Sequence, residues 1–411
     1  MGIGMNISSP IYRFIEFNPM QQELVDTPEM QRLRYLKQLS FVEKVFPDAT
    51  HTRFTHALGV SFLAGQFAKQ LKVSESEVRL VQAAGLLHDV GHLPFSHSLD
   101  IFVPQILKGK NIYTHEELGR AIVTGQIKLD LPGAGKIPYI LEKYKLNPED
   151  VGSLIAKQFN LKPYLQKIIS GGVDADRLDF LKRDSLNTGV VSGNVDQERI
   201  LQLALVNNNN LEFHHKAISP IREMLNARNV MYNEVYIHRT VNLAETMLKK
   251  AVELEIENLS DLPKMGDDEL LMRLEQSKSH KVKEIAQRIK YRNLYKIAFQ
   301  IQMHSTNEKQ KKTIDLLKKK ETGKIEMELI ELINKKRQIL GNNQELEYGD
   351  VLASFPHVEK IKYEKLFDKQ EINVYIPGKR NTNYSYFNVI CEEKLKAEVE
   401  YAVKEYLENL Q

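Results

Sequence analysis

The most informative part of this sequence is the segment from residue 85 to residue 97. It reads Gly85-Leu86-Leu87-His88-Asp89-Val90-Gly91-His92-Leu93-Pro94-Phe95-Ser96-His97. An apolar helix rarely ends in an adjacent histidine and aspartate followed by two more histidines. Burying imidazole and carboxylate groups at such a place is costly unless partners satisfy them. A divalent cation is an efficient partner, because neutral imidazole and carboxylate together suit transition-metal ions.

The helix that leads into this stretch limits how its residues can share an ion. The pattern predicts a buried helix from Ser76 to Val90, capped by Ser76 and ended by Gly91. Adjacent ligands on a helix point about 100° apart, so they can share one ion only near a helix end or opposite a crossing helix. Further ligands must therefore come from elsewhere in the chain.

Two distant residues are candidates for those ligands. His56 opens the preceding buried helical pattern, and Asp176 follows the segment Gly171-Gly172-Val173-Asp174-Ala175. Taken alone, His56 is more often a cap or a surface histidine, and Asp176 is equally well a helix-capping acid. The joint pattern with His88 and Asp89 favours a metal centre.

The order His56, then His88-Asp89, then Asp176 resembles the HD superfamily of metal-dependent phosphohydrolases. Two flanking segments, DTPEMQRLRYLKQL at 26–39 and VFPDATHTRFTH at 45–56, look like the deoxynucleoside triphosphate (dNTP) triphosphohydrolase branch. This branch includes the SAM-and-HD-domain nucleotide hydrolases. The resemblance implies one divalent metal held by His56, His88, Asp89 and Asp176. Fe, Mn, Zn, Ni and Mg all stay open as its identity.

The resemblance also implies catalytic residues. His115 matches the family's catalytic histidine, Asp100 the acid that orients it, and His92 and His97 positions that line the phosphate site. The implied reaction is in-line attack of water at the α-phosphorus, which breaks the bond to the 5′-oxygen and gives the nucleoside and tripolyphosphate. Protonated His115 would donate to the departing 5′-oxygen, while the metal polarises a phosphoryl oxygen and lowers the pKa of water. Without the resemblance, His115 is more simply a surface histidine at a helix start.

Substrate-binding residues follow from the same resemblance. Asp184 matches the residue that binds the 3′-hydroxyl. The other implied contacts are Gln38, Arg53, His97, Arg177, Phe180, Lys216, Arg228, Tyr232 and Tyr236. The cations among them would spread the negative charge of the phosphates. Each cation could instead be a surface salt-bridge partner, and both tyrosines could pack in the core.

Three positions depart from the pattern of the animal enzymes. Phe180 stands where they carry a tyrosine that helps to exclude a 2′-hydroxyl, and Ile237 stands where they carry glutamine. Arg177 replaces a lysine and would grip phosphate differently because its guanidinium is a planar fork. Phe180 and Ile237 keep a second hypothesis open, an HD phosphohydrolase that acts on a nucleoside monophosphate or on a cyclic or alarmone nucleotide.

A regulatory site is also implied. Asp26, Gln31 and Arg34 match residues that form an activating guanine-nucleotide site between subunits of the family. Such a site would make the protein a homodimer or homotetramer. The alternative is that Asp26 only caps a helix and that Arg34 is a surface residue.

The whole sequence predicts a mainly α fold, with a helical HD-domain core, a short N-terminal hairpin and a small C-terminal α+β appendage. We expect the HD phosphohydrolase core in residues 1–262, a charged helical extension in 263–344 and a small α+β region in 345–411. One long helix is expected from about Ile221 to Glu257, because this stretch lacks both glycine and proline.

Composition narrows the class of protein further. The 57 basic and 54 acidic side chains nearly balance, so no global charge draws the chain to nucleic acid or membrane. The single cysteine, Cys391, fits a reducing cytoplasm. We expect no signal peptide and no membrane span. The Lys-rich segment 308–320 is the one feature that favours a non-catalytic nucleotide- or RNA-binding regulator, although its interleaved acids are typical of a solvated helix face.

Overall fold

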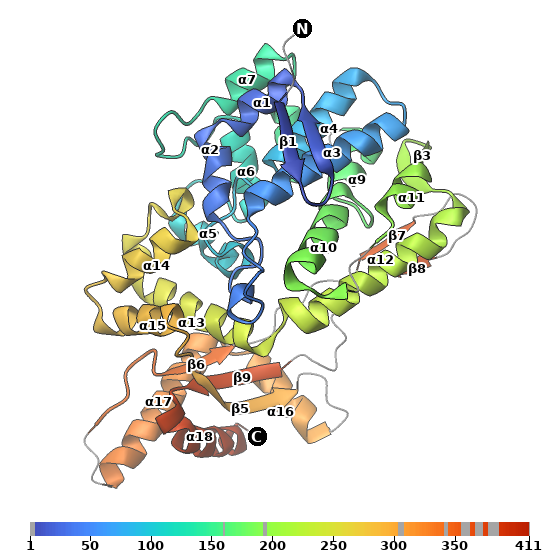
Figure 1. The fold of residues 1–411 in the computed structure, drawn as a ribbon. Coiled ribbons are helices and arrows are strands. Elements are labelled where there is room, and N and C mark those ends of the chain that lie inside the picture. Colours follow the sequence, from blue (N-terminus) through green and yellow to red (C-terminus); the bar gives the residue numbers. More distant parts are fainter. Residues whose placement is uncertain are drawn as a thin grey trace. The chain divides into compact units, whose positions relative to one another are not determined.

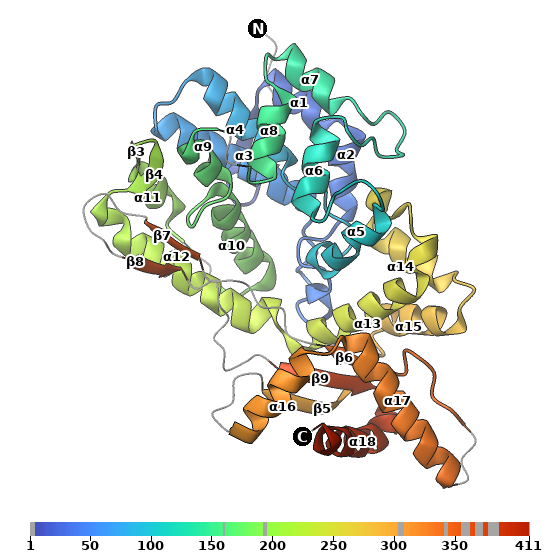
Figure 2. The same ribbon diagram turned by 180° about the vertical axis from the view of Figure 1, so that it is seen from behind.

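The computed structural model describes residues 5–158, 161–191, 195–302, 308–340, 344–354, 362–365, 373–376 and 386–410. The described chain is mainly helical, which confirms the predicted fold class (Figures 1 and 2). It forms two compact units that alternate along the sequence. The first comprises Met1–Tyr236, Ile256–Leu270 and Lys362–Ile376, and the second comprises Ile237–Glu255, Leu271–Ile361 and Pro377–Gln411. The expected boundaries after residues 262 and 344 stay predictions.

The first unit holds most of the helices. Its elements are β1 (Met5–Ser9), β2 (Arg13–Phe17), α1 (Pro19–Val25), α2 (Pro28–Arg32), α3 (Arg53–Gln70), α4 (Glu75–Leu87), α5 (Val103–Ile106), α6 (His115–Val123), α7 (Ile137–Lys143), α8 (Pro148–Ile155), α9 (Pro163–Ile169), α10 (Ala175–Thr188), α11 (Gln197–Gln202), β3 (Ala204–Asn207), β4 (Asn210–Phe213), α12 (Ile218–Met231), β7 (Lys362–Lys365) and β8 (Asn373–Ile376). The described strands of this unit pair in antiparallel fashion as β1–β2, β3–β4 and β7–β8.

Helix α3 is the centre of the first unit. It packs against α4, α9 and α10, and thirteen of its eighteen residues are buried. A helix that is apolar on nearly every side belongs in a core. The residues at its first turn therefore lie inside the unit, among the ends of α4 and α10.

Helix α4 differs from the prediction at both ends. Its cap is Ser74, not Ser76, because Ser74 and Glu77 form a reciprocal capping box. It ends at Leu87, with His88 at the C-cap, so the helix stops before Gly91 and not at it. His88 and Asp89 consequently lie beyond the last residue of the regular helix.

The long helix expected from Ile221 to Glu257 is interrupted, so that prediction is wrong. Helix α12 ends at Met231, a π-helical turn spans Tyr232–Tyr236, and α13 (Arg239–Glu255) follows. A π turn places an extra residue in one helical turn and is frequent at functional sites. No glycine or proline is needed for it, which is why the sequence pattern does not reveal the break.

The second unit contains a three-stranded sheet in the order β5-β9-β6, built from β5 (Lys296–Gln302), β6 (Val351–Ser354) and β9 (Tyr386–Cys391). Its helices are α13, α15 (His280–Lys290), α16 (Glu308–Lys318), α17 (Thr322–Ile339) and α18 (Lys396–Asn409), while α14 (Asp267–Glu275) begins in the first unit. Strand β5 lies in the region expected to be helical, because Ile297, Phe299 and Ile301 alternate with other residues as in a strand. Every helix in the described ranges is too short or too polar to cross a lipid bilayer.

Candidate active site

Four side chains converge where α3, α4 and α10 meet. His56 lies in the first turn of α3, His88 and Asp89 follow α4, and Asp176 lies in the first turn of α10. Asp176 Oδ1 is 3.0 Å from His56 Nε2 and 3.9 Å from His88 Nε2. Asp89 Oδ1 is 3.2 Å from His88 Nε2. We call these four residues the metal cluster.

The spacing of these donor atoms fits a divalent cation. Ligands at right angles around an ion with bonds of about 2.1 Å lie about 3.0 Å apart. The donor atoms of His56, His88 and Asp176 all lie within 4.8 Å of one another, and Asp89 Oδ1 adjoins this group at His88 Nε2. The imidazoles are also turned correctly. His56 Nδ1 lies 2.8 Å from Asp179 Oδ2, and His88 Nδ1 lies 2.8 Å from the Gly85 carbonyl oxygen. With each Nδ1–H donating outward, both Nε2 lone pairs face the cluster.

Asp179 orients His56 and is a site residue that the motif analysis missed. Its carboxylate is fully buried and accepts two hydrogen bonds from the Arg183 guanidinium, each 2.8 Å, and one of 2.8 Å from the Tyr12 hydroxyl. Burial favours the protonated acid, but Arg183 and His56 outweigh it and hold the pKa of Asp179 well below its usual range. The spacing of Asp179 from Asp176 and Arg183 on one helix was the available signal.

Gly59 has no side chain, and this leaves space for the Asp179 carboxylate between α3 and α10. A Cβ on Gly59 of α3 would lie 1.8 Å from Asp179 Oδ1, so no larger residue fits there without displacing the carboxylate.

Two opposing effects set the pKa of His56. Burial lowers it, yet the hydrogen bonds to Asp176 and Asp179 prevail and raise the pKa to about 10. Because a ligating imidazole is neutral, a cation that binds here displaces a proton.

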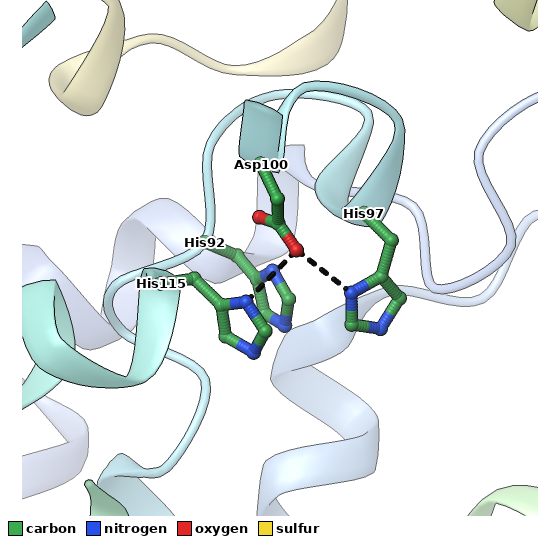
Figure 3. A group of neighbouring side chains, drawn as sticks. All are labelled: His92, His97, Asp100 and His115. Carbon is green, nitrogen blue, oxygen red and sulfur yellow. Dashed lines mark hydrogen bonds and ion pairs between the residues drawn. The ribbon is translucent and has the colours of Figure 1, made fainter. Parts of the chain in front are cut away.

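A second group of histidines lies beside the metal cluster and consists of His92, His97, Asp100 and His115 (Figure 3). Asp100 Oδ2 accepts a hydrogen bond of 2.9 Å from His115 Nδ1 and one of 3.0 Å from His97 Nδ1. The rings of His92 and His115 stack with centroids 3.8 Å apart. We call these residues the histidine cluster.

Charge and burial set the protonation of the histidine cluster. Burial favours the neutral form of Asp100, but its hydrogen bonds to His115 and His97 prevail and hold its pKa far below the usual range. Burial and the neighbouring Arg53 lower the pKa of His92 well below that of free imidazole. His92 is thus neutral at neutral pH, and Asp100 is ionised.

Arg53 and Asp89 link the two clusters. Asp89 Oδ1 lies 3.2 Å from His92 Nε2, and Asp89 Oδ2 accepts a hydrogen bond of 2.7 Å from Arg53. The Arg53 guanidinium also donates to the Ser96 hydroxyl. A Cβ on Gly91 would lie 2.1 Å from the His115 carbonyl oxygen, so glycine allows this loop to pack directly on the start of α6.

The expected sugar and base contacts gather around Asp184. The Tyr236 hydroxyl donates to Asp184 Oδ2 at 2.7 Å, and His51 Nε2 lies 2.8 Å from Asp184 Oδ1. Phe180 and Tyr232 each contact the ring of Tyr236 edge-on. The set is completed by Arg228 over the Tyr232 ring and by Gln38, whose backbone N–H donates to the His51 carbonyl. His51 was not predicted, because nothing in its own segment indicates a partner in α10.

Arg177 and Lys216, two cations predicted to bind phosphate, are not among the residues around Asp184. The Arg177 guanidinium donates to Asp174 Oδ2 at 2.8 Å, and Asp174 is the N-cap of α10. Lys216 is exposed in a short turn before α12. Their contacts with phosphate stay predictions.

The three residues of the expected regulatory site lie close together. Gln31 donates to the Val25 carbonyl at 2.7 Å, next to the exposed Asp26. Arg34 donates to Gln31 Oε1 at 2.8 Å, and its guanidinium lies 3.6 Å from the centroid of the Phe54 ring. This arrangement leaves the role of the three residues a prediction.

The fold and the paired histidines and carboxylates define an HD-domain protein. The family model described as HD domain matches residues 53–184, and the one described as HD associated region matches residues 195–408. The chain therefore belongs to the HD superfamily. The crystal structure of a hypothetical protein from Aquifex aeolicus has the same fold, with a TM-score of 0.73 and 24% identity over 98% of this chain and 100% of that chain.

Within this superfamily, the chain resembles the dNTP triphosphohydrolase branch. It is 31% identical to the deoxynucleoside triphosphate triphosphohydrolase SAMHD1 of Homo sapiens over 71% of this chain and 54% of that protein. It is 36% identical to an uncharacterized protein of Methanocaldococcus jannaschii over 71% of this chain and 58% of that protein. The chain thus matches little more than half the length of these relatives.

Proposed function

We propose that this protein is a metal-dependent dNTP triphosphohydrolase that converts a dNTP into a deoxynucleoside and tripolyphosphate. The observation that carries the proposal is the junction of the metal cluster with the Asp100–His115 pair through Asp89 and His92. A cation held by the metal cluster would therefore lie near His115, a histidine that can carry a proton. The similarity to the triphosphohydrolase of Homo sapiens supports a dNTP as the substrate.

Different side chains of the site would bind the metal, donate the proton and neutralise charge. A divalent cation held by the metal cluster would supply Lewis-acid polarisation of the phosphate and lower the pKa of water. Asp100 accepts from His115 Nδ1, which leaves His115 Nε2 to give its proton to the departing 5′-oxygen. Arg53 is buried between the clusters and neutralises charge that develops on the phosphate.

Selection of the sugar falls to the group around Asp184. The carboxylate is held on both oxygens, by Tyr236 and by His51, and can still accept from a 3′-hydroxyl through its remaining lone pairs. Phe180 offers the sugar an apolar face without a hydroxyl of its own. We expect less strict exclusion of a 2′-hydroxyl than a tyrosine would give there.

The proposal extends to regulation and location. Asp26, Gln31 and Arg34 would bind a guanine nucleotide that activates the enzyme, and the enzyme would act as a homodimer or homotetramer. A cytoplasmic location, expected from the single Cys391, belongs to the same proposal.

The second candidate function is hydrolysis of another nucleotide, which is favoured by Phe180 and Ile237. A regulator that binds RNA without catalysis would use the lysines of α16.

The test is a product analysis. Purified protein is incubated with each of the four dNTPs, singly and in pairs, with Mg²⁺ or Mn²⁺, and the products are separated by anion exchange. Tripolyphosphate and deoxynucleoside, absent from a His88→Ala, Asp89→Ala control, are the expected result. Product in mixtures alone indicates the activator site. Orthophosphate, pyrophosphate or a linearised nucleotide supports the second function, and no product from any mixture contradicts the dNTP proposal.

A further inference from the structure

The loop that carries His92 and His97 has an unfavourable backbone. Phe95 and Ser96 have φ angles of 53° and 52°, in the left-handed region that residues other than glycine seldom adopt. Such a conformation persists only where the surroundings impose it. Contacts that hold this loop are therefore needed to keep both histidines in place.

One of those contacts comes from the distant residue Asp267. Its Oδ1 accepts a hydrogen bond of 2.7 Å from the Phe95 backbone N–H, and its Oδ2 accepts one of 2.8 Å from the Lys37 backbone N–H. The residue is only 2% exposed. A single carboxylate thus joins the loop of the histidine cluster to the segment that carries Gln38.

A second contact comes from Arg32, which is 4% exposed. It donates to the His92 carbonyl at 2.7 Å and to the Met265 carbonyl at 3.1 Å. The guanidinium therefore ties the start of the same loop to the residues just before Asp267. Burial lowers the pKa of Arg32 to about 10, so the side chain is still a cation at neutral pH.

We infer that Asp267 and Arg32 are positioning residues that fix the His92–His97 loop against the rest of the site. Asp267 lies in the HD associated region, whereas the loop lies within the HD domain match. The associated region would thus complete the catalytic geometry of the HD domain. The inference rests on the proposed function, because it assigns the two residues to the phosphate hydrolysis of that same site.

The substitution Asp267→Asn changes the hydrogen bonding of this residue while its size stays nearly the same. Two backbone N–H donors require two acceptor oxygens, and a carboxamide has only one, so Asp267→Asn turns an N–H₂ group toward one of the donors. The neighbouring Asp268 is exposed, and Asp268→Asn is a control with the same change of charge. Arg32→Lys keeps the positive charge and removes the forked guanidinium that bridges two carbonyls.

The experiment compares two substrates. Turnover of a dNTP and of bis(p-nitrophenyl) phosphate with Mn²⁺ is measured for the wild type, the Asp268→Asn control and both test variants. Rates are normalised to metal content and to the folded fraction from thermal melts. We expect kcat to fall roughly 10²-fold on both substrates for both test variants, as for a small misplacement of catalytic groups. KM should rise for the dNTP only, and only with Asp267→Asn, because the diester has no sugar to contact near Gln38.

The outcomes separate the inference from the proposed function. Test variants that match the control in kcat and KM, or that lose activity only in proportion to their unfolded fraction, overturn the inference. If Asp267→Asn fails to fold, Arg32→Lys carries the comparison of kcat. A wild type that cleaves the diester but no dNTP contradicts the dNTP proposal and leaves the loop inference tested by the diester. A wild type inactive on both substrates contradicts both.

Discussion

The metal cluster and the histidine cluster are built from the same two residue types, yet they are arranged for different chemistry. In the metal cluster, the two histidines turn Nδ1 outward to Asp179 and to the Gly85 carbonyl, so that Nε2 points inward. In the histidine cluster, two histidines turn Nδ1 inward to one oxygen of Asp100. The first arrangement leaves lone pairs for a cation, and the second supports proton transfer by the outward ring nitrogens. The surrounding acceptors, more than composition, determine which chemistry a cluster can perform.

Of the three changes predicted here, removal of the metal should lower turnover the most. Chelation of the wild type should lower turnover by more than about 10⁴-fold, because the cation would supply several kcal/mol of stabilisation to the transition state. Adding back Mn²⁺ or Mg²⁺ should restore activity. The measurement is turnover alongside metal content by elemental analysis. Undiminished turnover by metal-free protein would contradict the assignment of the metal cluster.

Removing the proton carrier should have a smaller effect and should leave the metal in place. We expect His115→Gln to lower kcat by roughly 10²–10⁴-fold, the usual contribution of a general acid. Metal content should equal that of the wild type, since His115 belongs to the other cluster. His280→Gln, at an exposed position, is the matched control. Loss of metal from His115→Gln would mean that the two clusters act as one binding site.

Weakening the acceptor behind His56 should have the smallest effect of the three. Asp179→Asn should reduce metal affinity by about 10–100-fold, as loss of an orienting partner commonly does. The affinity is measured by competition with a chromogenic chelator, with Asp268→Asn as the control. Saturating metal should recover much of the activity. An unchanged affinity would show that Asp179 serves the packing of α3 on α10 and not the metal.

The sequence reveals those site residues that have a local signal. His88 and Asp89 are adjacent at the end of an apolar helix, and both other expected ligands, His56 and Asp176, join them in the structure. Asp179 has only its helical spacing from Asp176 and Arg183 as a signal. His51 and Asp267 have no such signal, because their roles depend on partners far away in the sequence. The last of these contacts a backbone N–H 172 residues distant. Contacts of a side chain with a remote backbone leave almost no pattern in a single sequence.

The same limit applies to the helices. The buried helical pattern that His56 opens corresponds to α3, because apolar residues continue along nearly its whole length. The N-cap of α4 was misplaced by two residues, since Ser74 and Ser76 are both plausible caps and only the capping box with Glu77 decides between them. The break at Tyr232–Tyr236 was missed because a π turn needs no helix-breaking residue.

That π turn sets the regularity of the helix against the contact that Tyr236 makes with Asp184. The additional residue in the turn rotates the following positions by about 100° relative to a continuous helix. Tyr236 reaches Asp184 from the end of this turn. A change that restores regular α-helical hydrogen bonding would make the helix more stable and would turn the tyrosine away from the carboxylate. The irregular turn thus exchanges regular helical hydrogen bonding for the contact of Tyr236 with Asp184, and selection for stability alone would remove it.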